Sequence, residues 1–156
     1  MALKNILNTY LLKGRRSDVP LIIGTTGDLP MKEIELMSKN APVTICPNFS
    51  LGMKTVEDML KTVPSNVFSV EMTEIHHTKK KDAPSGTAKR LAEIIDTENI
   101  HSMRLNDTIG EHTVFLSLNG ERIEIKHTVT DRNIFATGAI RVANWTIEQK
   151  NGLYYI

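Results

Sequence analysis

Cysteine is nearly absent from this chain, in which Cys46 is the only one among 156 residues. A single cysteine excludes an intrachain disulfide framework and a metal site built from paired cysteines, and it fits a reducing compartment. Long apolar runs are absent too, since stretches such as 21–23 are far shorter than the roughly 20 residues that span a bilayer. The start of the sequence lacks the apolar core of a secretory signal. We therefore expect a cytoplasmic protein that has no membrane partner.

An excess of charge of either sign is also missing. Nineteen Lys and Arg residues stand against 18 Asp and Glu residues, for a formal net charge of +1. Nothing in this balance indicates a general surface for nucleic acid, so any anion site has to be local. With 40% apolar residues, the chain can bury a real core as one domain or two small ones.

The first half of the sequence alternates between helical and strand patterns. Helices are predicted where apolar residues recur every three or four positions, and strands where apolar residues run together or alternate. The predicted helices are 3–11, 31–39, 51–63 and the segment after Ser85, and the predicted strands are 20–24, 43–46 and 67–76. Strands and helices that alternate with short links are typical of a parallel α/β sheet.

The second half carries a hairpin signal. Two alternating segments, 111–118 and 121–129, are separated by Asn119-Gly120, which favours a two-residue turn. Such a turn sets the cross-strand pairs on one side of the hairpin, which are His112–His127, Val114–Ile125 and Leu116–Ile123. We expect this side to be covered. A last helix follows, with an apolar face made of Ala136, Ala139, Ile140, Ala143 and Ile147.

Residues 74–95 gather charged and polar side chains in front of a predicted helix. Ser85-Gly86-Thr87 at the helix start offers backbone N–H groups and the positive end of the helix dipole, which suit a carboxylate or a phosphate. Three lysines, 79–81, stand just upstream. The alternative is that Ser85 is only a helix cap and the lysines only a solvated loop. The residue order does not match a P-loop.

His76 and His77 precede these lysines. Neighbouring residues of a strand point to opposite faces, and no third ligand lies at a zinc-like spacing, so we expect no metal site. One interpretation is a pair of hydrogen-bonded histidines at a strand end. The other is a titratable acid beside the anion site, because histidine can give up a proton near neutral pH.

The stretch Glu74-Ile-His-His-Thr-Lys-Lys-Lys-Asp-Ala-Pro-Ser-Gly-Thr-Ala88 resembles the signature of dihydrodipicolinate reductase, the 4-hydroxy-tetrahydrodipicolinate reductase of lysine and diaminopimelate synthesis. Five further segments follow the family's order, namely 23–27, 47–52, 110–114, 120–125 and 132–139. Together the six segments cover nearly the whole chain, and a chance match at six ordered places is implausible.

The resemblance implies a site with two parts. His76 would be the acid that protonates the substrate carbon after hydride transfer, and Lys80 would be its charged partner. The residues that would bind the cyclic dicarboxylate substrate are His77, Ser85, Gly86, Thr87 and Thr26. The residues that would line the nicotinamide end of NADH or NADPH are Gly24, Thr25, Thr26, Cys46, Pro47, Asn48 and Phe49. The cofactor would bring the hydride, while the protein supplies position, charge and the proton.

The implied fold is α/β joined to α+β. Residues 1–50 and 133–156 would form a partial Rossmann-like dinucleotide-binding domain with a parallel sheet. Residues 51–132 would form a mixed-sheet domain for substrate binding and oligomerisation. By resemblance we expect a homotetramer that assembles through the sheet of this second domain, with the apolar face of the hairpin as the part that serves.

The sequence departs from the family pattern in two places. The strand and GxxGxxG turn with which family members begin are missing, and with them the residue that selects between NADH and NADPH. A longer loop and an extra strand are missing between Ile95 and Gly110. We expect the catalytic and oligomerising part of a reductase whose N-terminal half is lost or is a separate polypeptide. The alternatives are a non-catalytic dicarboxylate-binding or assembly module derived from that enzyme and, more distantly, an unrelated nucleotide-binding α/β domain.

Overall fold

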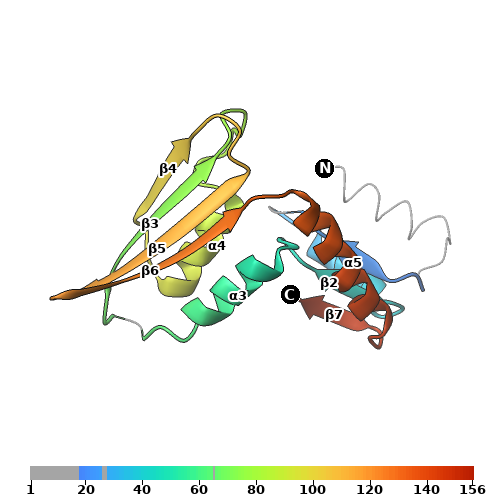
Figure 1. Cartoon of the computed structure of the whole chain (residues 1–156). Helices are drawn as coiled ribbons and strands as arrows, with labels where there is room; N and C mark the ends of the chain where they lie inside the picture. The colour runs from blue at the N-terminus through green and yellow to red at the C-terminus, as the bar shows by residue number, and fades with distance from the viewer. Residues whose placement is uncertain (1–17, 26–27, 65) are drawn as a thin grey trace. The chain divides into compact units, whose positions relative to one another are not determined.

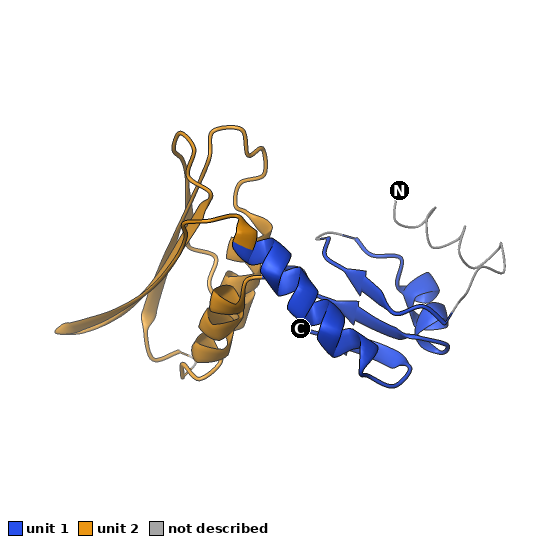
Figure 2. Cartoon of the chain, turned by 45° about the vertical axis from the view of Figure 1, so that its right-hand side comes forward, with its two compact units in different colours: residues 1–49, 134–156 blue, residues 50–133 orange. Residues whose placement is uncertain are grey.

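The structure, a computed structural model, describes residues 18–25, 28–64 and 66–156. The chain divides into two compact units: unit 1 comprises Met1–Phe49 and Ile134–Ile156, and unit 2 comprises Ser50–Asn133. Figure 2 shows the two units in different colours. The helix predicted at 3–11 and the proposed site residue Thr26 lie outside the described residues.

Unit 1 is built on a three-stranded parallel sheet with the order β1-β2-β7. Its elements are β1 (Leu21–Ile23), α2 (Met31–Ser38), β2 (Pro42–Ile45), α5 (Asn133–Ile147) and β7 (Gly152–Tyr155). The parallel α/β arrangement was predicted, and the fold class is confirmed. The strand β7 was not predicted, because residues 153–156 form only a short apolar stretch in the sequence.

The core of unit 1 lies between the sheet and α2. Its buried apolar residues are Ile23, Ile34, Met37, Val43 and Ile45. Thr44, the residue between the last two, is buried toward α5, with its Oγ1 atom 2.8 Å from Oγ1 of Thr146. Because neighbouring residues of a strand point to opposite faces, α2 and α5 cover opposite faces of this sheet.

Helix α5 lies very close to the backbone of Phe49 at a glycine, Gly138. A Cβ atom at Gly138 would lie 1.8 Å from the carbonyl oxygen of Phe49, so only glycine fits there. The buried residues of α5 are Gly138 and Thr146, whereas Ile140 and Ile147 of the predicted apolar face are 62% and 63% exposed. The spacing of apolar residues therefore indicated the helix but not its buried side.

Unit 2 is a four-stranded mixed sheet with two helices on one face, as Figure 1 shows. Its elements are α3 (Leu51–Leu60), β3 (Ser69–His76), α4 (Gly86–Ile95), β4 (Ile100–Arg104), β5 (Gly110–Leu118) and β6 (Glu121–Val129). The strand order is β4-β3-β5-β6, with β4 parallel to β3 and the other pairs antiparallel. The strand β4, which lies between Ile95 and Gly110, was not predicted from the sequence.

Serine caps start both helices of unit 2, and apolar stripes hold them on the sheet. The Ser50 hydroxyl accepts the Met53 N–H at the start of α3, and the Ser85 hydroxyl accepts the Ala88 N–H at the start of α4. The core that these helices cover contains Met53, Val56, Leu60, Met72, Leu91, Ala92, Val114 and Leu116. The face of β3 that carries Met72 is therefore the covered face of the sheet.

The hairpin has the predicted register, with Leu116 opposite Ile123 and Val114 opposite Ile125. Its apolar side is only partly covered, because β6 is an edge strand: Ile125 packs against the core, whereas Ile123 is 45% exposed. Val114 and Leu116 on the same side are buried in the core of unit 2, so the hairpin's apolar face is not the free assembly surface that the sequence suggested. In the part of the chain that the structure describes, no helix is long and apolar enough to cross a membrane.

We expect Gly138→Ala to destabilise the chain by about 2 kcal/mol, because overpacking against fixed atoms costs about 1–3 kcal/mol. Urea denaturation measures the change. The control is Thr137→Ala, an exposed neighbour in α5, which should change the free energy of unfolding by no more than about 0.5 kcal/mol. A Gly138→Ala variant more stable than the wild type, as at an exposed helical glycine, would contradict the close approach to Phe49.

Candidate active site

The alternation of β3 places two ionisable side chains on the covered face of the sheet. Met72, Glu74 and His76 are buried in turn, and Glu74 has no exposed surface. The loop after β3 returns to start α4 at Gly86, and this brings the Ser85 N–H to 3.3 Å from Oε1 of Glu74. The strand end and the helix start are thereby joined around one carboxylate.

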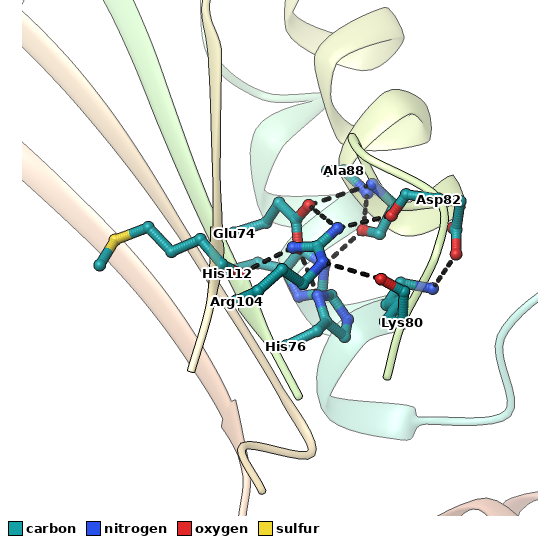
Figure 3. A network of polar contacts seen from close by, with 9 residues as sticks. Glu74, His76, Lys80, Asp82, Ala88, Arg104 and His112 are labelled. Carbon is teal, nitrogen blue, oxygen red and sulfur yellow. Dashed lines mark hydrogen bonds and ion pairs between the residues drawn. The ribbon is translucent and has the colours of Figure 1, made fainter. Parts of the chain in front are cut away.

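The Glu74 carboxylate is the centre of a polar network, shown in Figure 3. Its Oε1 atom accepts hydrogen bonds from Arg104 Nη2 at 3.0 Å and from the Ser85 N–H, while Oε2 bonds to Nδ1 of His76. Burial disfavours the ionised carboxylate, but hydrogen bonds from Arg104, Ser102 and His76 outweigh burial and hold the pKa of Glu74 below its ordinary value. The site therefore contains a buried carboxylate anion.

His76 lies at the end of β3, between the Glu74 carboxylate and the ring of His112. Burial lowers the pKa of its imidazole, Glu74 acts in the opposite direction, and the charges of Lys80 and Arg104 lower it further. Its ring stands edge-on to that of His112, with centroids 5.2 Å apart. A Cβ at Gly110 would be 3.1 Å from Nε2 of His76, so the glycine keeps this ring edge from being covered by a side chain.

Arg104, the last residue of β4, also fixes the loop that carries Lys80. Its Nε donates to the Lys80 carbonyl at 3.3 Å, and Nη2 donates to the Asp82 carbonyl. The Lys80 ammonium is 2.8 Å from Oδ1 of Asp82. One guanidinium thus links the loop of Lys80 to the carboxylate that holds His76.

Both the backbone N–H and the hydroxyl of Ser85 contact other residues of unit 2. Its N–H bonds to Glu74, and its hydroxyl accepts the Ala88 N–H and lies 3.2 Å from Nε2 of His112. Gly86 and Thr87 form the first residues of α4 beside it. His77 is partly buried, and its Nδ1 has no hydrogen-bond partner among the described residues. The structure therefore brings His76, Lys80 and the start of α4 together in one network.

Three residues of this network, Glu74, Arg104 and His112, had been given no role from the sequence. Glu74 stood inside the stretch that carried the resemblance, but a glutamate in a strand usually faces solvent. Arg104 belongs to the strand that was not expected. His112 was placed by the hairpin register on the covered side, which was the one available signal, and the structure shows it 6% exposed.

The predicted cofactor residues of unit 1 follow two neighbouring strands. Gly24 comes after β1 and Cys46 after β2, and the Cys46 N–H donates to the Ile23 carbonyl at 2.9 Å. The Cys46 thiol donates to the Asn48 carbonyl. A Cβ at Gly24 would lie 2.6 Å from the Phe49 ring, so the strand ends and the turn after β2 lie against each other. Among the described residues, no group of histidine, cysteine or acidic side chains could hold a metal ion.

The family model and the relatives that match this chain point to the same family. Residues 49–156 match the family model described as "Dihydrodipicolinate reductase, C-terminus". The chain is 43% identical to 4-hydroxy-tetrahydrodipicolinate reductase of Thermosipho africanus, over 86% of this chain and 64% of the relative. It is 37% identical to the enzyme of the same name from Methanocorpusculum labreanum, over 89% of this chain and 65% of the relative. The chain thus spans slightly less than two thirds of the length of these relatives.

A solved structure shows the same fold. It is described as "Dipicolinate bound Dihydrodipicolinate reductase from Paenisporosarcina sp. TG-14", and it superposes with a TM-score of 0.75 at 23% sequence identity. The similarity covers 99% of this chain and 69% of that one.

We expect Arg104→Met to destabilise the chain by about 3 kcal/mol or more, because it leaves the buried Glu74 carboxylate without its cationic partner. The matched control is Arg122→Met, which removes an exposed ion pair with Glu124 and should cost less than about 1 kcal/mol. Urea denaturation at neutral pH compares them. Equal small losses would mean that the buried pair contributes no more than a surface pair.

Stability should also fall as the pH drops from about 6.5 to about 4, because of His112. Burial, with smaller contributions from nearby charges, lowers the pKa of His112 to about 4, so in this window the unfolded chain takes up a proton that the folded chain does not. The loss is on the order of 3 kcal/mol. His112→Gln, which cannot titrate, should flatten this part of the curve of unfolding free energy against pH. An unchanged slope would show that His112 takes up its proton in the folded state.

Proposed function

Because the chain belongs to the dihydrodipicolinate reductase family, we propose that it binds a cyclic dicarboxylate and supplies the proton in an NADH- or NADPH-dependent reduction. The reaction is that of 4-hydroxy-tetrahydrodipicolinate to tetrahydrodipicolinate in lysine and diaminopimelate synthesis. The observation that supports this most directly is the single network in which Glu74 and Arg104 join His76, the Lys80 loop and the start of α4.

The dicarboxylate site is assigned to the start of α4 in unit 2. Backbone N–H groups of Gly86 and Thr87 lie at the positive end of the helix, where an anion is stabilised. The Lys80 ammonium, now paired with the exposed Asp82, can exchange that partner for a substrate carboxylate. The remaining residues assigned to the substrate are His77, Ser85 and Thr26. The similar solved structure is described as dipicolinate-bound, and dipicolinate is a ligand of this class.

His76 is assigned the acid role. A hydride is the chemistry that the nicotinamide cofactor supplies when bound, and the proton that completes the reduction at the substrate carbon comes from His76. Burial, together with the charges of Lys80 and Arg104, makes the His76 imidazolium a readier acid than a solvated one, since these effects lower its pKa. An anionic substrate beside it acts in the opposite direction, so the ring can be charged when the dicarboxylate is bound and can release its proton afterwards.

The cofactor is assigned to unit 1, as a partial dinucleotide-binding domain. Gly24 and Cys46 follow the carboxyl ends of two adjacent parallel strands, which is where open α/β sheets bind ligands. The set of residues assigned to the nicotinamide end is Gly24, Thr25, Thr26, Cys46, Pro47, Asn48 and Phe49. Glycine at position 24 allows the strand end to lie against Phe49.

Assembly as a homotetramer is assigned to unit 2, through the face of its sheet that α3 and α4 do not cover. Ile75 and Phe115 are half-buried on that face, among charged pairs such as Lys126 with Glu111. A cytoplasmic location, expected from the single cysteine, belongs to the same proposal.

The alternative is a non-catalytic dicarboxylate-binding or assembly module derived from the enzyme. The presence of both His76 and Lys80 beside the anion site favours the reductase, because an assembly module has no need for an acid. A reductase assay separates the two, run with this chain alone and with a separately expressed polypeptide that carries the GxxGxxG half. Turnover in either case supports the reductase, and dicarboxylate binding without turnover in both supports the module.

We expect pyridine-2,6-dicarboxylate to bind and to shift the backbone amide signals of Gly86 and Thr87 in an NMR titration. Lys80→Ala should weaken binding by about 1.5–3 kcal/mol, the range for a hydrogen bond to a charged group. The matched control is Lys81→Ala, an exposed lysine one residue further along, which should have little effect. If the two amides do not shift, or if both lysine variants bind equally, Ser85-Gly86-Thr87 is only a capped helix start.

A further inference from the structure

Hydrogen-bond accounting around Glu74 fixes which atom of His76 carries a proton. The Oε1 atom of Glu74 receives two donors, Arg104 Nη2 at 3.0 Å and the Ser85 N–H at 3.3 Å. Neither donor can accept a hydrogen bond, so this position must be held by an acceptor. The other oxygen, Oε2, faces Nδ1 of His76, and an ionised carboxylate has no proton to offer. The shared proton therefore has to be on Nδ1 of His76.

We propose that Glu74, held by Arg104, is a positioning residue that fixes His76 in its Nδ1–H form and so makes Nε2 the atom that gains and releases a proton. Neutral histidine carries one N–H, so a donor at Nδ1 leaves Nε2 with a lone pair. The tautomer follows from the contacts of this chain alone. The consequence for catalysis rests on the acid role proposed above for His76.

The surroundings of Nε2 agree with this assignment. The ring edge at Nε2 lies against Gly110, where any side chain would crowd it. The ionisable groups that act on His76 from the packed elements are Glu74 on β3, Lys80 in the following loop, Arg104 on β4 and His112 on β5. Of these, only Glu74 is hydrogen-bonded to the His76 ring.

The same guanidinium couples the two proposed catalytic side chains. Arg104 bonds to Glu74 through Nη2 and to the Lys80 carbonyl through Nε. A shift of the carboxylate would therefore move both the acid and the loop of its charged partner. Arg104 is a positioning residue in this sense, although it is not assigned any contact with substrate.

The test is Glu74→Gln, because the amide has one acceptor where the carboxylate has two. Arg104 and Ser85 require the amide oxygen at the Oε1 position, and the NH₂ group is then directed at Nδ1 of His76. Nδ1 must become an acceptor, so the neutral ring should invert to the Nε2–H form. The pKa of His76 should fall as well, because imidazolium would set two donors against each other and the negative charge is gone.

NMR of the full chain with ¹⁵N-labelled histidine measures both effects without cofactor or substrate. We expect Nδ1–H in the wild type and Nε2–H in Glu74→Gln, with a titration shifted to lower pH. The matched control is Glu71→Gln, which alters an exposed glutamate of the same strand that also pairs with a histidine, His101. This control should leave the His76 signals in their wild-type form.

A wild-type His76 with its neutral proton on Nε2 overturns the inference, and this measurement needs no variant to fold. An unchanged tautomer in a folded Glu74→Gln chain overturns it too. In the reductase assay, Glu74→Gln should lower kcat while leaving KM for the dicarboxylate nearly unchanged. If the tautomer inverts but no form of the protein shows turnover, the positioning role stands and the proposed reductase function fails.

Discussion

Everything at this site depends on one buried anion, the carboxylate of Glu74. An ionised carboxylate out of water is costly unless charges and hydrogen-bond donors surround it, and here the donors come from separate segments of unit 2. They are Arg104 and Ser102 on β4, the Ser85 amide before α4, and His76 on β3 itself. Satisfying the anion therefore forces the parallel strand β4, the helix start and the strand end to meet at one place. The proposed acid and the proposed carboxylate site are neighbours for this reason.

The two units are stabilised by different kinds of contact. Unit 1 is held by apolar contacts between α2 and a small parallel sheet, with a glycine contact and a buried threonine pair under α5. Unit 2 has its own apolar core, and its polar network lies on the same covered face of β3 as that core. The strand β3 buries Met72, Glu74 and His76 at alternate positions, so it contributes to both the apolar core and the polar network. Specificity for a dicarboxylate would then come from groups whose positions the network already determines.

Sequence patterns were sufficient wherever structure depends on neighbouring residues. The helix start at Ser85, the hairpin turn and its register, and the helices α2, α3, α4 and α5 all follow from local spacing, and the structure has them. Patterns failed where the outcome depends on distant partners. The strand β4 is short and most of its residues are exposed, so it lacks a clear strand pattern in the sequence. It is identified as a strand by its pairing with β3. The buried side of α5 is set by its close contact with the Phe49 backbone. No periodicity within the helix predicts that contact.

For the site, the family resemblance pointed to His76, Lys80 and the Ser85–Thr87 helix start, and the structure brings these together without testing their roles. It could not point to Arg104, because an arginine at the end of an unexpected strand has no visible partner in the sequence. The most direct test of the account is a crystal structure of the chain with pyridine-2,6-dicarboxylate. The account predicts a ligand carboxylate at the amides of Gly86 and Thr87, Lys80 turned from Asp82 toward it, and Glu74 still bonded to Arg104 and His76. A ligand bound elsewhere, or a Glu74 carboxylate released from Arg104 on binding, would contradict it.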